Sequence, residues 1–225
     1  MIFDDEIKKV INETLNLNES LVAQEKKFNL NTEYLSDANK QNHVELYKNY
    51  IKEFNEISAK LDSVNRGSSD SNNSEYRNLK VAETYNMNAA YLHELYFANI
   101  SDARSKITTD SLSFMRLERD FGSFDNWQKD FIACCLASQC GWAITYLNTY
   151  TQTYMNCSID LHSVNVPFGS YPVIVMDVWQ HAYYKDYLKD VKTYTIAMMK
   201  QLNWKVIEKR IKRADAILNV VKGKN

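Results

Sequence analysis

Histidine is the residue type in this 225-residue sequence that is most suited to chemistry, and it occurs only four times. His43 and His93 each lie on the apolar side of a segment with helical periodicity, and His162 lies in an expected loop. His181 follows Asp177 by four residues within MDVWQHAYYKDY, where large aromatic residues surround both. Polar groups in an aromatic, water-poor environment need a partner. Three imidazoles and one carboxylate form a donor set that suits iron, manganese or zinc.

Two long helices joined by a polar loop are predicted to bring His43 and His93 together. Apolar residues recur at helical spacing after an N-cap at Ser36, and a second periodic segment runs from about Ser74 to Ile100. Between them, SVNRGSSDSNN (residues 63–73) is typical of an exposed loop. In an antiparallel hairpin with its apex near residue 68, each histidine lies 25 residues from the apex, as two facing side chains require.

The second half of the sequence has a different pattern. It predicts a helix capped near Ser123, two strands within residues 141–161 with a turn near residues 149–152, and a third strand in YPVIVMDVW. Helices are expected at roughly 180–187, 190–202 and 204–220. The fold class is therefore α+β: a long N-terminal antiparallel helical hairpin, then a C-terminal domain with a three-stranded antiparallel sheet and surrounding helices.

The expected division of the chain has three parts. Residues 1–27 form an N-terminal extension, either a short helix or a loosely docked segment. Residues 28–112 form the helical hairpin domain, and residues 113–225 form the α/β C-terminal domain.

Composition excludes several classes of partner. Hydrophobic residues make up 45% and charged residues 24%, as in an ordinary soluble globular protein. A net charge of −1 provides no basic field for nucleic acid or an anionic membrane surface. No apolar run approaches the roughly 18 residues of a membrane span, and the acidic N-terminus is not a secretory signal. We therefore expect a cytoplasmic protein with reduced thiols at Cys134, Cys135, Cys140 and Cys157.

Five motifs, in order along the chain, resemble the iron/manganese superoxide dismutase family. They are HELYFANI, FGSFDNWQKDF, GWAITYLN, MDVWQHAYYKDY and LNWKVIEKRI, and the resemblance extends from about Phe28 to Ile211. DVWQHAYY is close to the family signature DVWEHAYY. The resemblance implies that His43, His93, Asp177 and His181 hold one Fe or Mn ion per chain. The fold that it implies agrees with the fold predicted from the pattern.

The implied activity is that of an enzyme, a superoxide dismutase, with superoxide as its small-molecule substrate. In the implied ping-pong cycle the oxidised metal takes an electron from one superoxide, which leaves as dioxygen. The reduced metal then gives an electron to a second superoxide, which leaves as hydrogen peroxide after gaining two protons. A water or hydroxide ligand would carry one of those protons, because metal binding lowers its pKa.

The resemblance also assigns roles to residues around the metal. Tyr50, seven residues after His43, resembles the family's gateway tyrosine, although Tyr47 is a rival candidate. The aromatic residues that resemble the cage that excludes bulk water are Trp142, Trp179 and Tyr184.

The sequence departs from the family where a side chain would orient the metal-bound solvent. On the second helix, Ala89 stands where many members have a glutamine, and alanine cannot form the hydrogen bond. His162 is the nearest match in the loop before the third strand. We expect His162 to orient the solvent and to influence the redox potential; the alternative is an exposed loop histidine.

Two further departures concern the dimer and the substrate. Gln180 stands where the family has a glutamate that reaches the partner subunit's metal histidine, here His181, in a homodimer. Its amide oxygen can still accept the imidazole N–H, but without the charge that strengthens such a bond. The family's substrate-steering arginine aligns on Val191, which leaves Lys189 and Lys192 as nearby cations.

Two other functions stay open from the sequence. A non-catalytic structural or interaction protein that retains the fold is compatible with the departures at Gln180 and Val191. A zinc hydrolase could use the same donors, but it needs a general base, for which the ligand motifs offer only Asp177 and Glu94.

Overall fold

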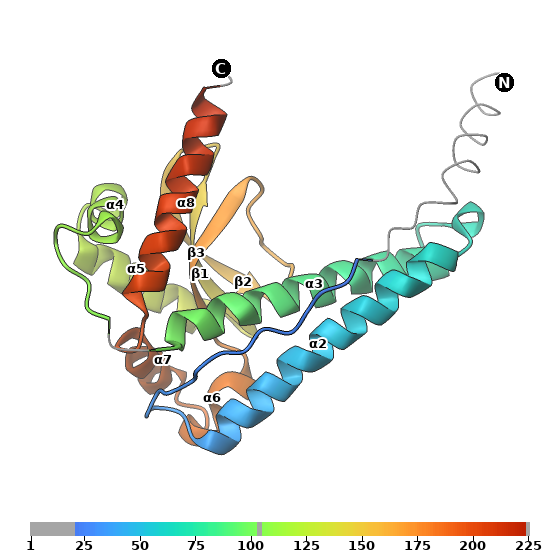
Figure 1. Cartoon of the computed structure of the whole chain (residues 1–225), viewed down its shortest axis with the longest axis horizontal. Coiled ribbons are helices and arrows are strands. Elements are labelled where there is room, and N and C mark those ends of the chain that lie inside the picture. The colour runs from blue at the N-terminus through green and yellow to red at the C-terminus, as the bar shows by residue number, and fades with distance from the viewer. Residues whose placement is uncertain (1–20, 103–104, 224–225) are drawn as a thin grey trace. The chain divides into compact units, whose positions relative to one another are not determined.

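The computed structural model describes residues 21–102 and 105–223, and the chain divides into two compact units (Figure 1). The first unit contains Lys48–Ala90 with residues 21–25, and the second contains Lys26–Tyr47 and the chain from Tyr91 onward. Helices α2 (Asp37–Ser63) and α3 (Glu75–Ile100) contribute residues to both units. Each unit is therefore made of residues that cluster in space and come from more than one stretch of the sequence.

The helix expected near the N-terminus falls largely on residues 1–20, which lie outside the described residues. Residues 21–36 form neither helix nor strand. Two backbone amides of this stretch donate to side chains of α2 within the first unit: Leu21 to Ser58 (2.7 Å) and Ala23 to Asn55 (2.8 Å). The expected boundaries at residues 27 and 112 stay a prediction.

The first unit is an antiparallel pair of helices joined by a polar loop, which confirms the predicted hairpin (Figure 1). The loop contains a short 3-10 helix, η2 (Arg66–Ser68). The apolar core of this unit is formed by Ile57, Leu61 and Val64, packed against Tyr76, Leu79 and Ala82.

Serine residues cap the N-termini of two helices, α2 and the helix that follows Ser123, at the positions that the sequence predicts. The Ser36 hydroxyl accepts a hydrogen bond from the Asn39 amide at 3.2 Å, and Ser123 accepts one from the Asn126 amide at 3.0 Å. Each bond satisfies an amide that has no partner within its helix. The predicted N-caps are therefore confirmed.

The second unit is built on a three-stranded antiparallel sheet with strand order β2-β1-β3. The strands are β1 (Gly141–Asn148), β2 (Thr153–Asp160) and β3 (Ser170–Asp177). All eight residues of the central strand β1 are buried. The β1–β2 turn lies at residues 149–152, as predicted, and Trp142 of β1 is paired with Asp177 of β3.

Helices surround this sheet, and α5 packs on β1 and β2 whereas α8 packs on β3 (Figure 1). They are α4 (Leu112–Phe121), α5 (Phe124–Ala137), α6 (Gln180–Tyr187), α7 (Val191–Met199) and α8 (Trp204–Lys222). The predicted α+β class is confirmed, but the sequence analysis missed α4, which is capped by Ser111 and ends at Gly122 with a left-handed backbone (φ 79°). No described helix is long and apolar enough to cross a membrane.

Gly141 generates a prediction about the sheet, because it begins β1 where two strands approach closely. A Cβ atom at this position would lie 1.8 Å from the Ile159 carbonyl oxygen of β2, so Gly141→Ala must push the strands apart. We expect the free energy of unfolding to fall by ~3 kcal/mol. Gly223→Ala is the matched control, because its nearest contact is 3.5 Å and its cost should stay below ~0.5 kcal/mol. Equal thermal midpoints for the two variants would show that the strands do not constrain this position.

Candidate metal centre

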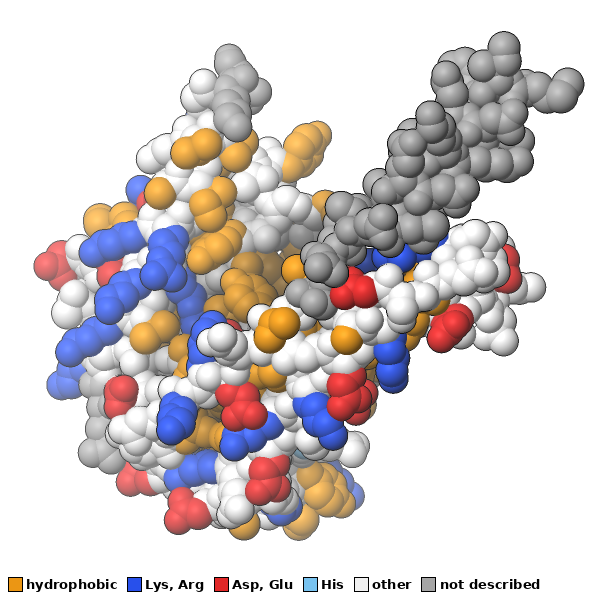
Figure 2. Space-filling view, turned by 45° about the vertical axis from the view of Figure 1, so that its right-hand side comes forward, with side chains coloured by type: hydrophobic (Ala, Val, Ile, Leu, Met, Phe, Trp, Pro, Cys, Tyr) orange, Lys and Arg blue, Asp and Glu red, His pale blue; other side chains and the backbone are white. Residues whose placement is uncertain are grey.

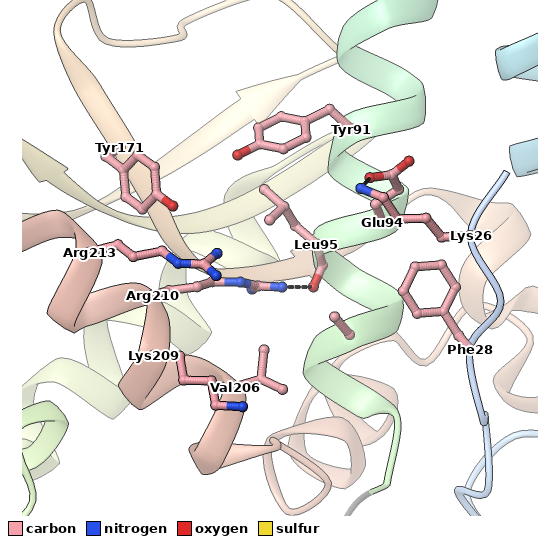
Figure 3. Close-up of a pocket in the computed structure, with 11 residues that line it drawn as sticks. Lys26, Phe28, Tyr91, Glu94, Leu95, Tyr171, Val206, Lys209, Arg210 and Arg213 are labelled. Carbon is pink, nitrogen blue, oxygen red and sulfur yellow. Dashed lines mark hydrogen bonds and ion pairs between the residues drawn. The ribbon is translucent and has the colours of Figure 1, made fainter. Parts of the chain in front are cut away.

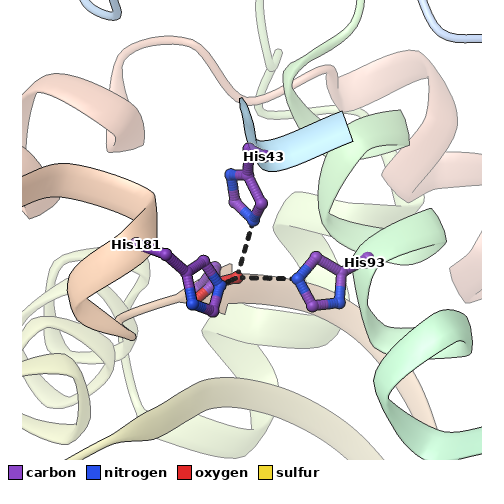
Figure 4. A group of neighbouring side chains, drawn as sticks. His43, His93 and His181 are labelled. Atoms are coloured by element: carbon purple, nitrogen blue, oxygen red, sulfur yellow. Dashed lines mark hydrogen bonds and ion pairs between the residues drawn. The ribbon is translucent and has the colours of Figure 1, made fainter. Parts of the chain in front are cut away.

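Four side chains with metal-binding donors converge in the second unit, each from a different element (Figure 4). His43 comes from the second turn of α2 and His93 from the last two turns of α3. Asp177 is the last residue of β3, and His181 is the second residue of α6. The parts of α2 and α3 that belong to the second unit therefore meet the strand-to-helix junction, as the sequence predicts.

One carboxylate oxygen lies at the middle of this group. Asp177 Oδ2 lies 3.1 Å from His43 Nε2, 3.2 Å from His181 Nε2 and 3.6 Å from His93 Nε2. His43, His93 and Asp177 are almost completely buried, whereas the His181 side chain keeps 25% of its exposure. The three imidazoles thus surround a carboxylate that water does not reach, and His181 lies on the open side.

Burial and charge act in opposite directions on these groups. Burial lowers the pKa of His43, which favours its neutral form, the form that can ligate a metal. Burial opposes ionisation of Asp177, but the charge and hydrogen bond of His181 and the hydrogen bond of His43 outweigh it, so the pKa of Asp177 lies well below its usual range. The site therefore combines an anionic carboxylate with imidazole nitrogens that can donate electron pairs.

The donor atoms fit a single metal ion. One donor atom from each residue lies within 4.8 Å of all the others. Ligands placed about 2 Å from one ion must lie within ~4 Å of one another, so the set needs only a small contraction. A cation between the donors would compensate the buried charge of Asp177 and occupy the imidazole lone pairs. Imidazole and carboxylate together suit iron and manganese.

Hydrogen bonds hold Asp177 in place through both its carboxylate and its backbone carbonyl. The Trp179 amide donates to Asp177 Oδ1 at 2.9 Å, and the Tyr194 hydroxyl donates to the Asp177 carbonyl at 2.8 Å. The Tyr194 and Tyr96 hydroxyls lie 2.9 Å apart, and both residues are completely buried. The sequence analysis missed this tyrosine pair. Tyr96 could have been found from its position three residues after His93, whereas no local signal identifies Tyr194.

His162 is inside this site and is fully buried, so the alternative of an exposed loop histidine is wrong. Its ring stacks on Trp179 at a centroid distance of 5.1 Å and lies 6.1 Å from the ring of His93. Trp142 Nε1, which can only donate, lies 3.0 Å from His162 Nδ1. His162 Nδ1 must therefore accept, and the neutral ring carries its proton on Nε2. Burial lowers the pKa of His162 to about 4, which keeps the ring neutral near pH 7.

The aromatic residues named from the sequence have different environments. Trp142 is fully buried, with its ring centroid 4.9 Å from that of His93, and Trp179 stacks on His181 at 5.8 Å. Tyr184 is 51% exposed and lines the mouth of a pocket with His43, Gln180 and His181. Trp142 and Trp179 thus form a wall, whereas Tyr184 lies at the rim.

The two gateway candidates also differ. Tyr47 is fully buried, and its hydroxyl donates to Glu94 and accepts from the Lys26 amide, both at 3.0 Å. Tyr50 belongs to the first unit, where its ring centroid lies 6.4 Å from that of Tyr85. The hydroxyl of Tyr47 is therefore already engaged inside the protein.

Comparisons with known proteins agree with this geometry. The family described as iron/manganese superoxide dismutases, C-terminal domain, matches residues 110–210. The chain is 35% identical over 188 residues to a superoxide dismutase [Fe] of Aquifex aeolicus, covering 82% of this chain and 87% of that protein, and equally similar to one of Aquifex pyrophilus. It is 31% identical over 131 residues to a superoxide dismutase [Mn] 1 of Halobacterium salinarum, covering 58% of this chain and 64% of that protein. The chain therefore belongs to the iron/manganese superoxide dismutase family.

Proposed function

We propose that this protein is a superoxide dismutase that converts two superoxide anions and two protons into dioxygen and hydrogen peroxide. The observation that carries the proposal is the buried set of three imidazoles and one carboxylate, whose donor atoms lie within 4.8 Å of one another in a chain of this family. The bound ion, one Fe or Mn per chain, supplies a one-electron redox couple that superoxide can reduce and then reoxidise.

The metal ligands would be His43, His93, Asp177 and His181. The Asp177 carboxylate would compensate part of the ion's charge, and the Trp179 amide fixes its orientation while the Tyr194 hydroxyl holds the backbone carbonyl of Asp177. Because these contacts come from the start of α6 and from α7, they would keep Asp177 in one orientation while the ion supplies and accepts an electron.

We assign His162 as the residue that orients a solvent molecule beside the metal. Its neutral ring has the only ring proton on Nε2, and Trp142 holds the ring in that tautomer. A donor fixed in this way can stabilise one protonation state of the solvent over another, and that preference changes both proton delivery and redox potential. His162 therefore takes the place of the glutamine that the second helix lacks at Ala89.

Superoxide would enter on the side where His181 is exposed. A cavity of about 280 Å³ on this side is lined by Asn42, His43, Gln180, His181, Tyr184 and Lys185. Lys185 is a cation that the sequence analysis did not name, and its place at this opening makes it better suited to attract superoxide than Lys189 or Lys192. Tyr50 is the gateway residue proposed from the family resemblance, whereas the hydroxyl of Tyr47 bonds to Glu94 and to the Lys26 amide.

A homodimer is part of the proposal. Among the described residues, His181 Nδ1 has no hydrogen-bond acceptor, while Nε2 faces Asp177. Gln180 is exposed beside it and can accept that proton from a second copy of the chain. We also propose a cytosolic location, which the four free thiols support.

The first prediction from this proposal concerns metal and activity together. Purified protein loaded with Fe or Mn should contain about one ion per chain and consume superoxide. Asp177→Asn removes the charge from the donor set and should lower activity at least ~100-fold with loss of the ion. Asp110→Asn, an exposed residue with the same charge change, is the control. Zinc without dismutation would indicate a hydrolase, and a folded chain that binds no metal would indicate a structural protein.

His162 generates a second prediction, in which the ratio of the Fe-loaded to the Mn-loaded activity is the readout. His162→Ala should lower the activity about 10- to 100-fold and change that ratio, because the solvent loses its donor. His162→Gln keeps an amide donor and should retain more activity than His162→Ala. Trp142→Phe removes the hydrogen bond that fixes the tautomer of His162, so its activity should lie between the activities of these two variants. Unchanged kinetics with either metal in His162→Ala would remove this residue from the mechanism.

Gln180 generates a third prediction, about the dimer. Gln180→Glu restores a charged acceptor for His181 of the second copy and should lower the dimer dissociation constant about tenfold. Analytical ultracentrifugation over a concentration series measures this constant. Gln152→Glu places the same charge in the exposed β1–β2 turn and should leave the dimer dissociation constant unchanged. A protein that stays monomeric at all concentrations, or equal constants for both variants, would refute the proposed contact.

A further inference from the structure

A second pocket in the larger unit contains a concentration of positive charge that the metal centre does not explain (Figure 3). It has a volume of about 320 Å³ and lies between the segment around Lys26, helix α3, the start of β3 and helix α8. None of the four metal donors lines it. Four cations and one carboxylate face this space: Lys26, Lys209, Arg210 and Arg213, with Glu94.

Arg210 is the buried charge of this pocket, with only 6% of its surface exposed. Its guanidinium donates to the carbonyl oxygens of Leu95 (2.9 Å) and Val173 (3.3 Å) and to the side-chain oxygen of Asn99, as Figure 3 shows for Leu95. All of these acceptors are neutral. Burial lowers the pKa of Arg210 to about 10, because desolvation disfavours the charged form. A buried cation without an anionic partner is costly unless an anion reaches it.

The carboxylate in the pocket cannot supply that compensation, because it is already engaged. Glu94 forms an ion pair with Lys26 and accepts a hydrogen bond from the Tyr47 hydroxyl. Arg213 and Lys209, which are exposed on α8, form no ion pair with any described residue. The side of the pocket formed by α8 therefore carries three positive charges and no negative charge.

The lining also has groups that suit an organic anion. Figure 3 places Tyr171 near Arg213 and Tyr91 across the pocket, so two phenol groups accompany the guanidinium groups. Phe28, Leu95 and Val206 add apolar surface. On the face of the molecule in Figure 2, Lys and Arg side chains gather in a band, whereas Asp and Glu side chains are scattered. The cations of α8 that line the pocket would attract anions toward it.

We propose that this pocket binds a small phosphate monoester, with the phosphate held by Arg210, Arg213 and Lys209 and the organic part against the tyrosines and apolar side chains. The exposed Arg213 guanidinium presents a planar pair of N–H donors that matches the spacing of phosphate oxygens, and Arg210, whose terminal nitrogens donate to Leu95, Val173 and Asn99, adds its positive charge. The volume of the pocket limits the ligand to the size of a mononucleotide or smaller. The proposal does not depend on dismutation, because the pocket shares no donor with the metal centre.

Isothermal titration calorimetry of the metal-loaded protein tests the proposal, with inorganic phosphate and adenosine monophosphate as separate probes at constant ionic strength. We expect one saturable site per chain and tighter binding of the monoester than of inorganic phosphate. Arg213→Gln and Lys209→Gln should each weaken binding at least ~10-fold, because each removes a charge-assisted hydrogen bond. Both residues are exposed, so the variants should keep the thermal midpoint of the parent protein.

Lys222→Gln is the matched control, because Lys222 is also an exposed lysine of α8 but does not line the pocket. It should bind both probes with the affinity of the parent protein. Three results would overturn the proposal: absence of saturable binding, equal affinity in Arg213→Gln and Lys222→Gln, or inorganic phosphate binding as tightly as the monoester. Superoxide consumption is measured separately on the same samples, so a failure of the proposed activity is distinguishable from a failure of this pocket.

Discussion

The burial of one carboxylate is the constraint on which the rest of this structure depends. Asp177 is fully buried at the end of β3, where an unpaired charge would be very costly. Its Oδ2 atom lies 3.1–3.6 Å from imidazole nitrogens of α2, α3 and α6. The two long helices, the strand end and the start of α6 must therefore meet at one point, and a metal ion held there would compensate the charge that the fold has buried.

The sheet and the aromatic residues around Asp177 hold the site in one arrangement through strand pairing and hydrogen bonds. Trp142 is paired with Asp177 across β1 and β3, and the same side chain sets the tautomer of His162. The hydroxyls of Tyr96 and Tyr194 continue the hydrogen-bonded network on the other side of Asp177. A site held in this way would change little if the charge of a bound ion changed, which suits an electron-transfer cycle. His181 is the exception, because its partly exposed ring faces the opening.

The sequence predicts those parts of the structure that depend on local pattern. The equal distance of His43 and His93 from the hairpin apex is enough to predict that they meet, and their ring centroids lie 5.1 Å apart. Serine caps and β-branched runs similarly locate α2, α5 and the strands. Contacts between residues far apart in the sequence cannot be predicted from such local patterns. Arg210 reaches Leu95 across 115 residues, and Tyr194 reaches Tyr96 across 98, with no spacing rule to indicate either contact. Helix α4 was missed although the sequence has a local signal for it, the N-cap Ser111 and a buried face that includes Leu117.

The most direct test of the central claim is anomalous diffraction from crystals of the purified protein, measured at the iron and manganese absorption edges. The account predicts one strong peak per chain at one of these edges, about 2 Å from His43 Nε2, His93 Nε2, Asp177 Oδ2 and His181 Nε2. A peak at another place in the chain, or four side chains that keep the separations seen here with no iron or manganese signal between them, would contradict it.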